Sequence, residues 1–219
     1  IAHEIKNPLT PIKLSIDRLK NKTNKGMNIS ETEVIDTMDT INRQVDDIKN
    51  LVDEFSNFAR MPAPNMKKYN IKDIVVNAIS LFDLKSNKIV IDLDKKSLDR
   101  SIKCDESQIN RVLNNLIINS IHSIESKYNN ESGGIIYIDA SLNDNYLKIK
   151  IFDNGQGLSH KEEDLLKPYF STKEKNIGTG LGLSIVEKII SEHGGNFHIY
   201  NLEDKSGACS EFTLRLFND

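Results

Sequence analysis

The sequence has few cysteines, no long apolar run and no excess of charge of either sign. Its two cysteines, Cys104 and Cys209, lie too far apart in the 219 residues to match the spacing of a zinc site. We therefore expect two reduced thiols, as in a cytosolic protein, and not a disulfide framework. No apolar run approaches the roughly 18–20 residues that a membrane span needs, so these residues alone are not expected to cross a bilayer.

The charge balance is close to neutral, because 29 Lys and Arg face 32 Asp and Glu, which gives a formal charge of −3. Nucleic-acid-binding domains usually carry a basic stripe, so no nucleic-acid partner is expected. With 38% hydrophobic residues the composition is that of a globular chain, long enough for one large domain or two modest ones. The first residue is Ile, which leads us to expect a longer parent protein whose upstream segments supply any membrane contact.

The first 60 residues or so predict two helices with a narrow apolar seam. The spacing alternates between three and four residues, which is typical of a coiled coil or bundle. The seam positions are Ile5, Leu9, Ile12, Ile16, Leu19, Val34, Met38, Ile41, Val45, Ile48, Val52, Phe55 and Ala59. Ser30 followed by Glu33 predicts a capping box for the second helix, and residues 21–28 are expected to form the loop. Since two helices are half of a four-helix bundle, we expect a homodimer.

A proline-rich run at residues 61–64 ends the helical pattern, and we expect a domain boundary after residue 62. Beyond it, short β-rich runs and helical patterns follow one another without a regular alternation. This mixture predicts an α/β sandwich, in which one sheet carries helices on one face. The predicted strands cover residues 88–93, 135–142, 146–152, 196–201 and 211–216, and the predicted helices cover residues 71–84, 106–125 and 179–193.

Three polar residues stand at the start of the first helix, outside its apolar seam. His3, Glu4 and Asn7 should therefore face outward, with His3 and Asn7 one turn apart. An exposed imidazole beside a carboxylate can act as a nucleophile whose proton the neighbour takes. The alternative is a solvated surface histidine. A zinc site of the His-Glu-x-x-His kind is excluded, because position 7 is Asn.

Two segments of the second region have residue types suited to a nucleotide. Asn115 and Asn119 are four apart on one helical face, where an amide oxygen can bind Mg²⁺, unless each only makes a local hydrogen bond. Asp153 ends an apolar strand and is followed by Gly155 and Gly157. A buried carboxylate there can accept a hydrogen bond from an exocyclic amine such as that of adenine, and the alternative is a simple turn.

A third segment is rich in glycine and opens a strong helical pattern. Backbone N–H groups that glycines expose at a helix N-terminus can bind an anion. The run consists of Gly178, Thr179, Gly180, Leu181 and Gly182, and its spacing is not that of a dinucleotide fingerprint. In the polar loop before it, Lys173 can either meet a phosphate or remain a solvated surface charge.

In this order, the segments resemble the catalytic core of two-component sensor histidine kinases. The resembling boxes are the H box at residues 3–11, the N box at 115–119, the G1 box at 153–157, the F box at 168–173 and the G2 box at 178–182. The resemblance covers essentially the whole chain. Residues 2–19 and 58–64 are similar to those of NtrY-type nitrogen-regulatory kinases.

The resemblance implies an α+β architecture of two domains. Residues 1–62 would be a helical hairpin for dimerisation and histidine phosphotransfer, which forms a dimeric four-helix bundle. Residues 63–219 would be an α/β-sandwich ATP-binding domain of the Bergerat (GHKL) type. The implied activity is autophosphorylation with ATP and Mg²⁺, followed by transfer to an Asp in the receiver domain of an NtrX-like response regulator. The implied location is the cytoplasmic side of a parent protein anchored in the bacterial inner membrane.

The resemblance also implies a role for individual residues. His3 would be the phosphoacceptor and Glu4 its base, and Asn7 would position water if the kinase also dephosphorylates its regulator. Asn119 would bind Mg²⁺, and Asp153 would contact adenine. The positions placed around ATP are Asn115, Asn119, His122, Asp153, Gly155, Gly157, Lys173, Gly178, Thr179, Gly180, Leu181 and Gly182.

Three positions depart from the family pattern. His122 stands where Lys or Arg is frequent, Leu166 replaces the first aromatic residue of the F box, and Ser120 replaces an alanine.

Two other classes of protein remain as alternatives. One is a non-catalytic ATP-binding scaffold or a phosphatase-only module, and the other is a GHKL ATPase of the chaperone or mismatch-repair kind.

Overall fold

The structure is a computed structural model that describes residues 2–82, 89–129, 131–143, 145–170, 180–203 and 206–216. The chain divides into two units, of which the first comprises the helical residues 1–61 together with residues 173–181, and the second comprises residues 62–172 and 182–219. In the described part of the chain, every helix is too short or too polar to cross a membrane.

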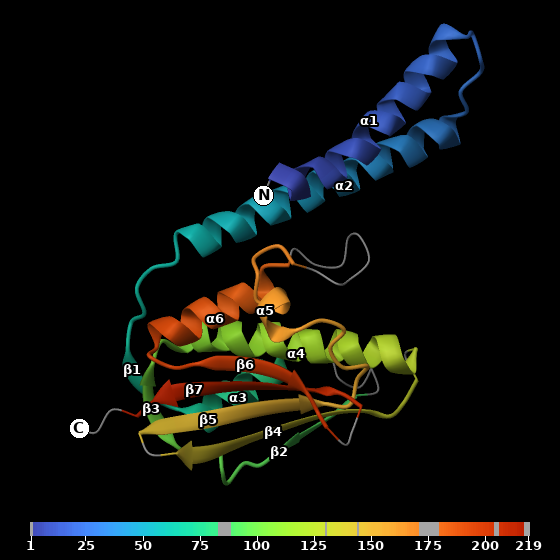
Figure 1. Cartoon of the computed structure of the whole chain (residues 1–219). Coiled ribbons are helices and arrows are strands. Elements are labelled where there is room, and N and C mark those ends of the chain that lie inside the picture. The colour runs from blue at the N-terminus through green and yellow to red at the C-terminus, as the bar shows by residue number, and fades with distance from the viewer. Residues whose placement is uncertain are drawn as a thin grey trace. The chain divides into compact units, whose positions relative to one another are not determined.

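The helical unit is a hairpin of α1 (Ala2–Asn24) and α2 (Glu31–Ala59) (Figure 1). Ser30 caps α2 as predicted, because its Oγ accepts the N–H of Glu33 at 3.2 Å. The Glu33 carboxylate pairs with Lys22 of α1, with the ammonium 2.6 Å from Oε1. The loop is shorter than expected, since α1 continues to Asn24 and includes Lys22 in its last turn.

Six of the thirteen predicted seam positions are exposed in the single hairpin. Along α2, Ile41 and Ile48 are half-buried, whereas the seam positions between and beside them are exposed. The exposed seam residues are Leu9, Ile16, Met38, Val45, Val52 and Ala59. One hairpin therefore covers only one side of each helix, and an apolar stripe remains open on α2.

The second unit contains a five-stranded sheet with the order β2-β4-β5-β7-β6. Its strands are β2 (Ile89–Leu93), β4 (Gly134–Asn143), β5 (Tyr146–Asp153), β6 (Phe197–Asn201) and β7 (Ala208–Arg215). The β2–β4 pair is parallel and the other three pairs are antiparallel. A separate antiparallel pair, β1 (Lys67–Asn70) with β3 (Ser101–Cys104), was not predicted, because strands of four residues are too short to reveal their period.

Helices cover one face of the large sheet. The helices on this face are α4 (Glu106–Tyr128) and α6 (Gly182–Glu192). Helix α3 (Ile71–Ser80) packs against α4, and the short α5 (Glu162–Leu165) contacts the edge strand β6. In Figure 1, α4 and α6 lie side by side over the sheet, and both contact its strands. Leu147, Ile149 and Ile151 alternate with exposed or half-buried residues along β5 and form part of the buried core below α4. The predicted α/β sandwich is thus confirmed.

Candidate nucleotide site

Asp153 is the last residue of β5, and the period of the strand directs its side chain into the core. It continues the series Leu147, Ile149 and Ile151, and it is only 8% exposed. Its Oδ1 accepts the N–H of Gly155 at 2.9 Å, and its Oδ2 accepts the hydroxyl of Ser120 on α4 at 3.3 Å. A carboxylate therefore lies where strand β5, helix α4 and the following loop meet.

Burial raises the pKa of the Asp153 carboxyl above its ordinary value, because the charged form loses hydration. The backbone N–H groups of Gly155 and Ala208 oppose this increase, and so does the Ser120 hydroxyl, since each donates to the carboxylate. The local donors thus favour an ionised hydrogen-bond acceptor in an apolar setting. Such a group is suited to recognise a donor on a ligand.

Gly155 is required because the loop approaches α4 very closely. A Cβ at this position would lie 2.2 Å from Ser123 Oγ and 2.6 Å from the carbonyl carbon of Ser123. The neighbouring N–H of Gln156 donates to the Ser123 carbonyl at 3.2 Å. Ser123 Oγ is buried and has no hydrogen-bond partner among the described residues. The loop is therefore packed on the helix backbone itself.

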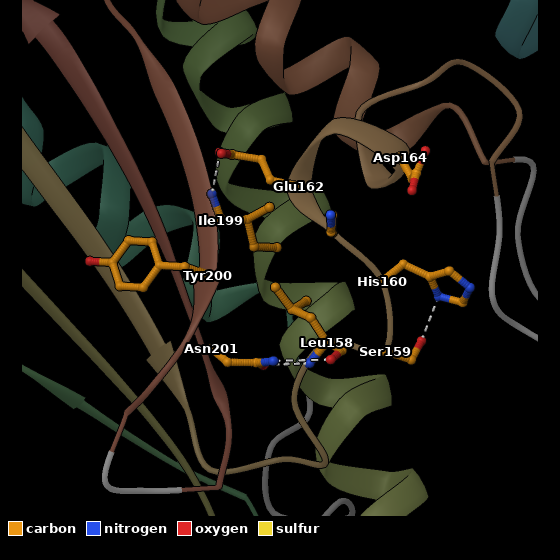
Figure 2. A pocket seen from close by; sticks show the side chains of 9 residues that line it. Leu158, Ser159, His160, Glu162, Asp164, Ile199, Tyr200 and Asn201 are labelled. Carbon is orange, nitrogen blue, oxygen red and sulfur yellow. Dashed lines mark hydrogen bonds between the residues drawn. The ribbon is translucent and has the colours of Figure 1, made fainter.

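Two residues that the sequence reasoning missed hold the loop from the other side. Asn201, at the end of β6, accepts the N–H of Leu158 at 2.7 Å and donates to its carbonyl at 3.0 Å (Figure 2). A Cβ on Gly207 would lie 1.9 Å from the Asp153 carbonyl oxygen, and its φ of +131° also favours glycine. In the sequence, the pair Ser206-Gly207 before β7 indicates a turn. The contact of Gly207 with Asp153 could not be predicted from it, because the two residues are more than 50 positions apart.

Asn154 shows that residues 153–157 form a turn, which is compatible with a binding role for Asp153. Its Oδ1 accepts the N–H of Ile135 at 2.8 Å, and its Nδ2 donates to the Gly133 carbonyl at 2.8 Å and to the Tyr128 hydroxyl at 3.0 Å. These bonds fix the turn after Asp153 to β4 and α4. The Asp153 carboxylate therefore belongs to a rigid frame.

The predicted N box and G2 box meet at Asn115 and Gly182. Asn115 Nδ2 donates to the Arg111 carbonyl at 2.8 Å, which is the local hydrogen bond that the sequence left open as an alternative. Its Oδ1 would lie 2.8 Å from a Cβ on Gly182, the first residue of α6. Asn119 and His122 are half-buried one and two turns further along α4. The start of α6 thus packs against the predicted N box.

Several predicted positions are only partly described. Gly180 has a φ of +69°, which favours glycine, and Leu181 is buried. Lys173, Gly178 and Thr179 lie outside the described residues. His3 and Glu4 belong to the first turn of α1, but their side chains are outside the described part, whereas Asn7 is exposed on that helix. The predictions of outward-facing His3 and Glu4 side chains therefore stay predictions.

The oxygen atoms of Asn115, Asn119 and Asp153 suit a nucleotide that brings its own Mg²⁺ better than a metal ion bound by protein side chains alone. The described residues contain no group of three or more His, Cys, Asp or Glu side chains that could hold a metal ion. Amide oxygens of the Asn115–Asn119 face are oxygen donors, which suit Mg²⁺ bound mainly through phosphate and water. The buried acceptor Asp153 suits the amine of a base.

A separate open cavity of about 770 Å³ lies beside the edge strand β6. Figure 2 shows its walls, where Glu162 accepts the N–H of Ile199 at 2.9 Å. It is lined by Leu158, Ser159, His160, Lys161, Glu162, Asp164, Ile199, Tyr200 and Asn201. The predicted nucleotide residues are absent from this lining, so the cavity is not the predicted site.

Residues 104–218 match the family described as histidine kinase-, DNA gyrase B- and HSP90-like ATPases. Residues 1–64 match the His Kinase A (phospho-acceptor) domain. The first match covers the described Asp153, Asn115 and Gly182, and the second covers the hairpin.

The relatives agree with these two matches. The chain is 39% identical over 218 residues to the nitrogen regulation protein NtrY of Azorhizobium caulinodans, covering 98% of this chain and 28% of that protein. It is 37% identical over 207 residues to the putative sensor histidine kinase NtrY-like of Rickettsia prowazekii, covering 94% of this chain and 33% of that protein. The chain thus spans about a third of the length of these relatives.

Among solved structures, histidine kinase ThkA in complex with response regulator protein TrrA superposes with a TM-score of 0.72. The two chains are 24% identical, and the match covers 99% of this chain and 60% of that one. This likeness concerns the fold. The match over residues 104–218 shows that the chain belongs to the family of histidine kinase-, DNA gyrase B- and HSP90-like ATPases, and residues 1–64 add a His Kinase A (phospho-acceptor) domain to it.

Proposed function

We propose that this chain transfers the γ-phosphoryl group of ATP to His3 and then to an aspartate of a response regulator. The observation that carries the proposal is the buried Asp153 carboxylate, held by Gly155 and by Ser120 of α4, the helix whose Asn115 packs against Gly182. The family membership of both segments supports the same reaction. Residues 1–62 supply the acceptor histidine, and residues 63–219 bind the nucleotide.

The nucleotide is held by groups that differ in chemistry. Asp153 accepts a hydrogen bond from the exocyclic amine of adenine, while Gly155 and Gly157 leave room for the base. Gly180 and Gly182, with Gly178 from the same glycine run of the sequence, would offer backbone N–H groups to the phosphates at the start of α6. Asn119 would hold Mg²⁺, with Asn115 beside it, and the ion would supply neutralisation of phosphate charge.

Phosphoryl transfer depends more on positioning and charge neutralisation than on covalent help from the enzyme. In the proposed step, His3 Nε2 forms a bond to the γ-phosphorus while the bond to the bridging oxygen of ADP breaks. Glu4 accepts the proton from the other ring nitrogen and orients the imidazole. Lys173 and His122 contribute positive or donor groups near the phosphates. Where the kinase also dephosphorylates its regulator, Asn7 positions the attacking water.

Two partners follow from the hairpin. A second copy of the chain covers the exposed seam residues of α1 and α2, which completes a four-helix bundle. The receiver domain of an NtrX-like response regulator accepts the phosphoryl group from His3. The relative ThkA, whose structure includes a response regulator protein, supports this second partner.

The direct test is incubation of the chain with γ-³²P-ATP and Mg²⁺. Acid-labile, alkali-stable label is expected on the unaltered chain and is expected to be absent from His3→Gln and Asn119→Asp. His198→Gln, which alters an exposed histidine on β6, should be labelled normally. Label that persists in His3→Gln, or that survives acid, would refute the assignment. Transfer is then measured by adding a purified receiver domain and following loss of label from the chain.

A further inference from the structure

Ser120 uses its hydroxyl in an unusual way for a serine inside a helix. Serine in this setting often bonds back to the carbonyl four residues earlier, but Ser120 Oγ donates to Asp153 Oδ2 at 3.3 Å. The residue is only 4% exposed, and it lies between Asn119 and the apolar Ile121 on α4. The buried Ser120 hydroxyl of α4 therefore has the Asp153 carboxylate, at the end of β5, as its described hydrogen-bond partner.

The Asp153 carboxylate is held from both sides by this arrangement. Gly155 N–H binds Oδ1 at 2.9 Å from the loop side, and Ser120 binds Oδ2 from the helix side. Two donors on different oxygens restrict rotation of the carboxylate plane about the Cβ–Cγ bond. An ionised carboxylate has about four lone-pair sites, so the donors of Gly155, Ala208 and Ser120 leave room for one hydrogen bond from a ligand.

We infer that Ser120 is a positioning residue for base recognition: it fixes the orientation in which Asp153 accepts the exocyclic amine of adenine. This inference rests on the proposed nucleotide site and adds a specificity-determining contact to it. Ser120 itself does not touch the base. Its contribution is limited to the bond between Asp153 and the amine, so a nucleotide without that amine gains nothing from Ser120.

The test compares ATP with purine riboside triphosphate, which lacks only the 6-amino group. Affinities of the whole chain for both nucleotides are measured calorimetrically with Mg²⁺, for the unaltered chain and for Ser120→Ala. We expect the unaltered chain to prefer ATP, and Ser120→Ala to lose about tenfold in affinity for ATP, the effect of one hydrogen bond to a charged group. Its affinity for purine riboside triphosphate should be unchanged.

Two further variants separate positioning from stability. Ser126→Ala alters an exposed serine on the same helix and should change neither affinity. Ser120→Cys keeps the size of the side chain with a weaker donor and should lose affinity for ATP selectively. Equal loss for both nucleotides in the Ser120 variants, or no loss, would overturn the positioning role. Equal affinities of the unaltered chain for both nucleotides would instead refute the adenine contact of Asp153 itself.

Discussion

Replacing Gly155 by Ala tests whether the nucleotide loop needs its close approach to α4. The new Cβ would lie 2.6 Å from the carbonyl carbon of Ser123, whereas carbon atoms pack best at about 3.5–4.0 Å. The loop must therefore move by about 1 Å, because the backbone of a buried helix cannot yield. Overpacking of this kind typically costs about 1–3 kcal/mol, and a displacement of that size at a site can reduce activity about a hundredfold.

The expected result is a lower urea midpoint and an affinity for ATP reduced about tenfold or more, measured by denaturation and calorimetry. Gly26→Ala is a suitable control. Gly26 has a φ of +63° but nothing within 4 Å of a Cβ, so this variant adds backbone strain in the hairpin loop without touching the nucleotide site.

A double variant identifies which contact matters. Ser123→Gly removes the Oγ that would lie 2.2 Å from the new Cβ, but it leaves the carbonyl carbon in place. Combined with Gly155→Ala, it should restore only part of the affinity. Binding of ATP by Gly155→Ala at the level of the unaltered chain, with an unchanged urea midpoint, would refute the reasoning.

Three further predictions concern charge, a buried histidine and the seam. Burial raises the pKa of Asp153 in the folded state above its ordinary value of 3.8, so the protein loses stability as the pH rises through that folded-state pKa. Asp153→Asn should therefore raise Tm at pH 7 and abolish ATP binding. A lower Tm together with retained ATP binding would contradict this prediction. His193 is only 3% exposed, and its Nε2 accepts the N–H of Asp105 at 3.0 Å. His193→Phe should lower the free energy of unfolding in urea by about 1–3 kcal/mol, because the buried N–H loses its acceptor. An unchanged urea midpoint would show that this hydrogen bond does not stabilise the fold. The double variant Met38→Glu, Val45→Glu should be a monomer by light scattering, whereas Leu14→Glu, which lies off the seam, should remain a dimer. If both variants were dimers, the seam would not be the dimer interface.

Much of the candidate site could be predicted from local patterns. The period of β5 places Asp153 on the same face as Leu147 and Ile149, so a buried acid at the strand end could be inferred from alternation alone. The four-residue spacing of Asn115 and Asn119 likewise indicated one face of α4. These inferences succeed because side-chain direction within one element follows from its backbone geometry.

Local patterns gave poorer information at element ends and in short strands. The prediction of a loop from residue 21 was wrong because the Lys22–Glu33 pair and backbone bonding continue α1 to Asn24. Within the described ranges, the strands Lys67–Asn70 and Ser101–Cys104 pair only with each other, across more than 30 residues. Their stability comes from this pairing, and four residues carry too few side chains to show a period.

The sequence by itself determined the order of the motifs, the helical seam, the strand alternation and the glycines that a nucleotide loop needs. Tertiary structure alone decided which distant groups meet. Ser120 donates to Asp153, Asn201 holds Leu158, and Gly207 leaves space for the Asp153 carbonyl. Periodicity fixes the face on which a side chain lies, but the partner on that face depends on strand order and helix packing, which join segments far apart in the chain.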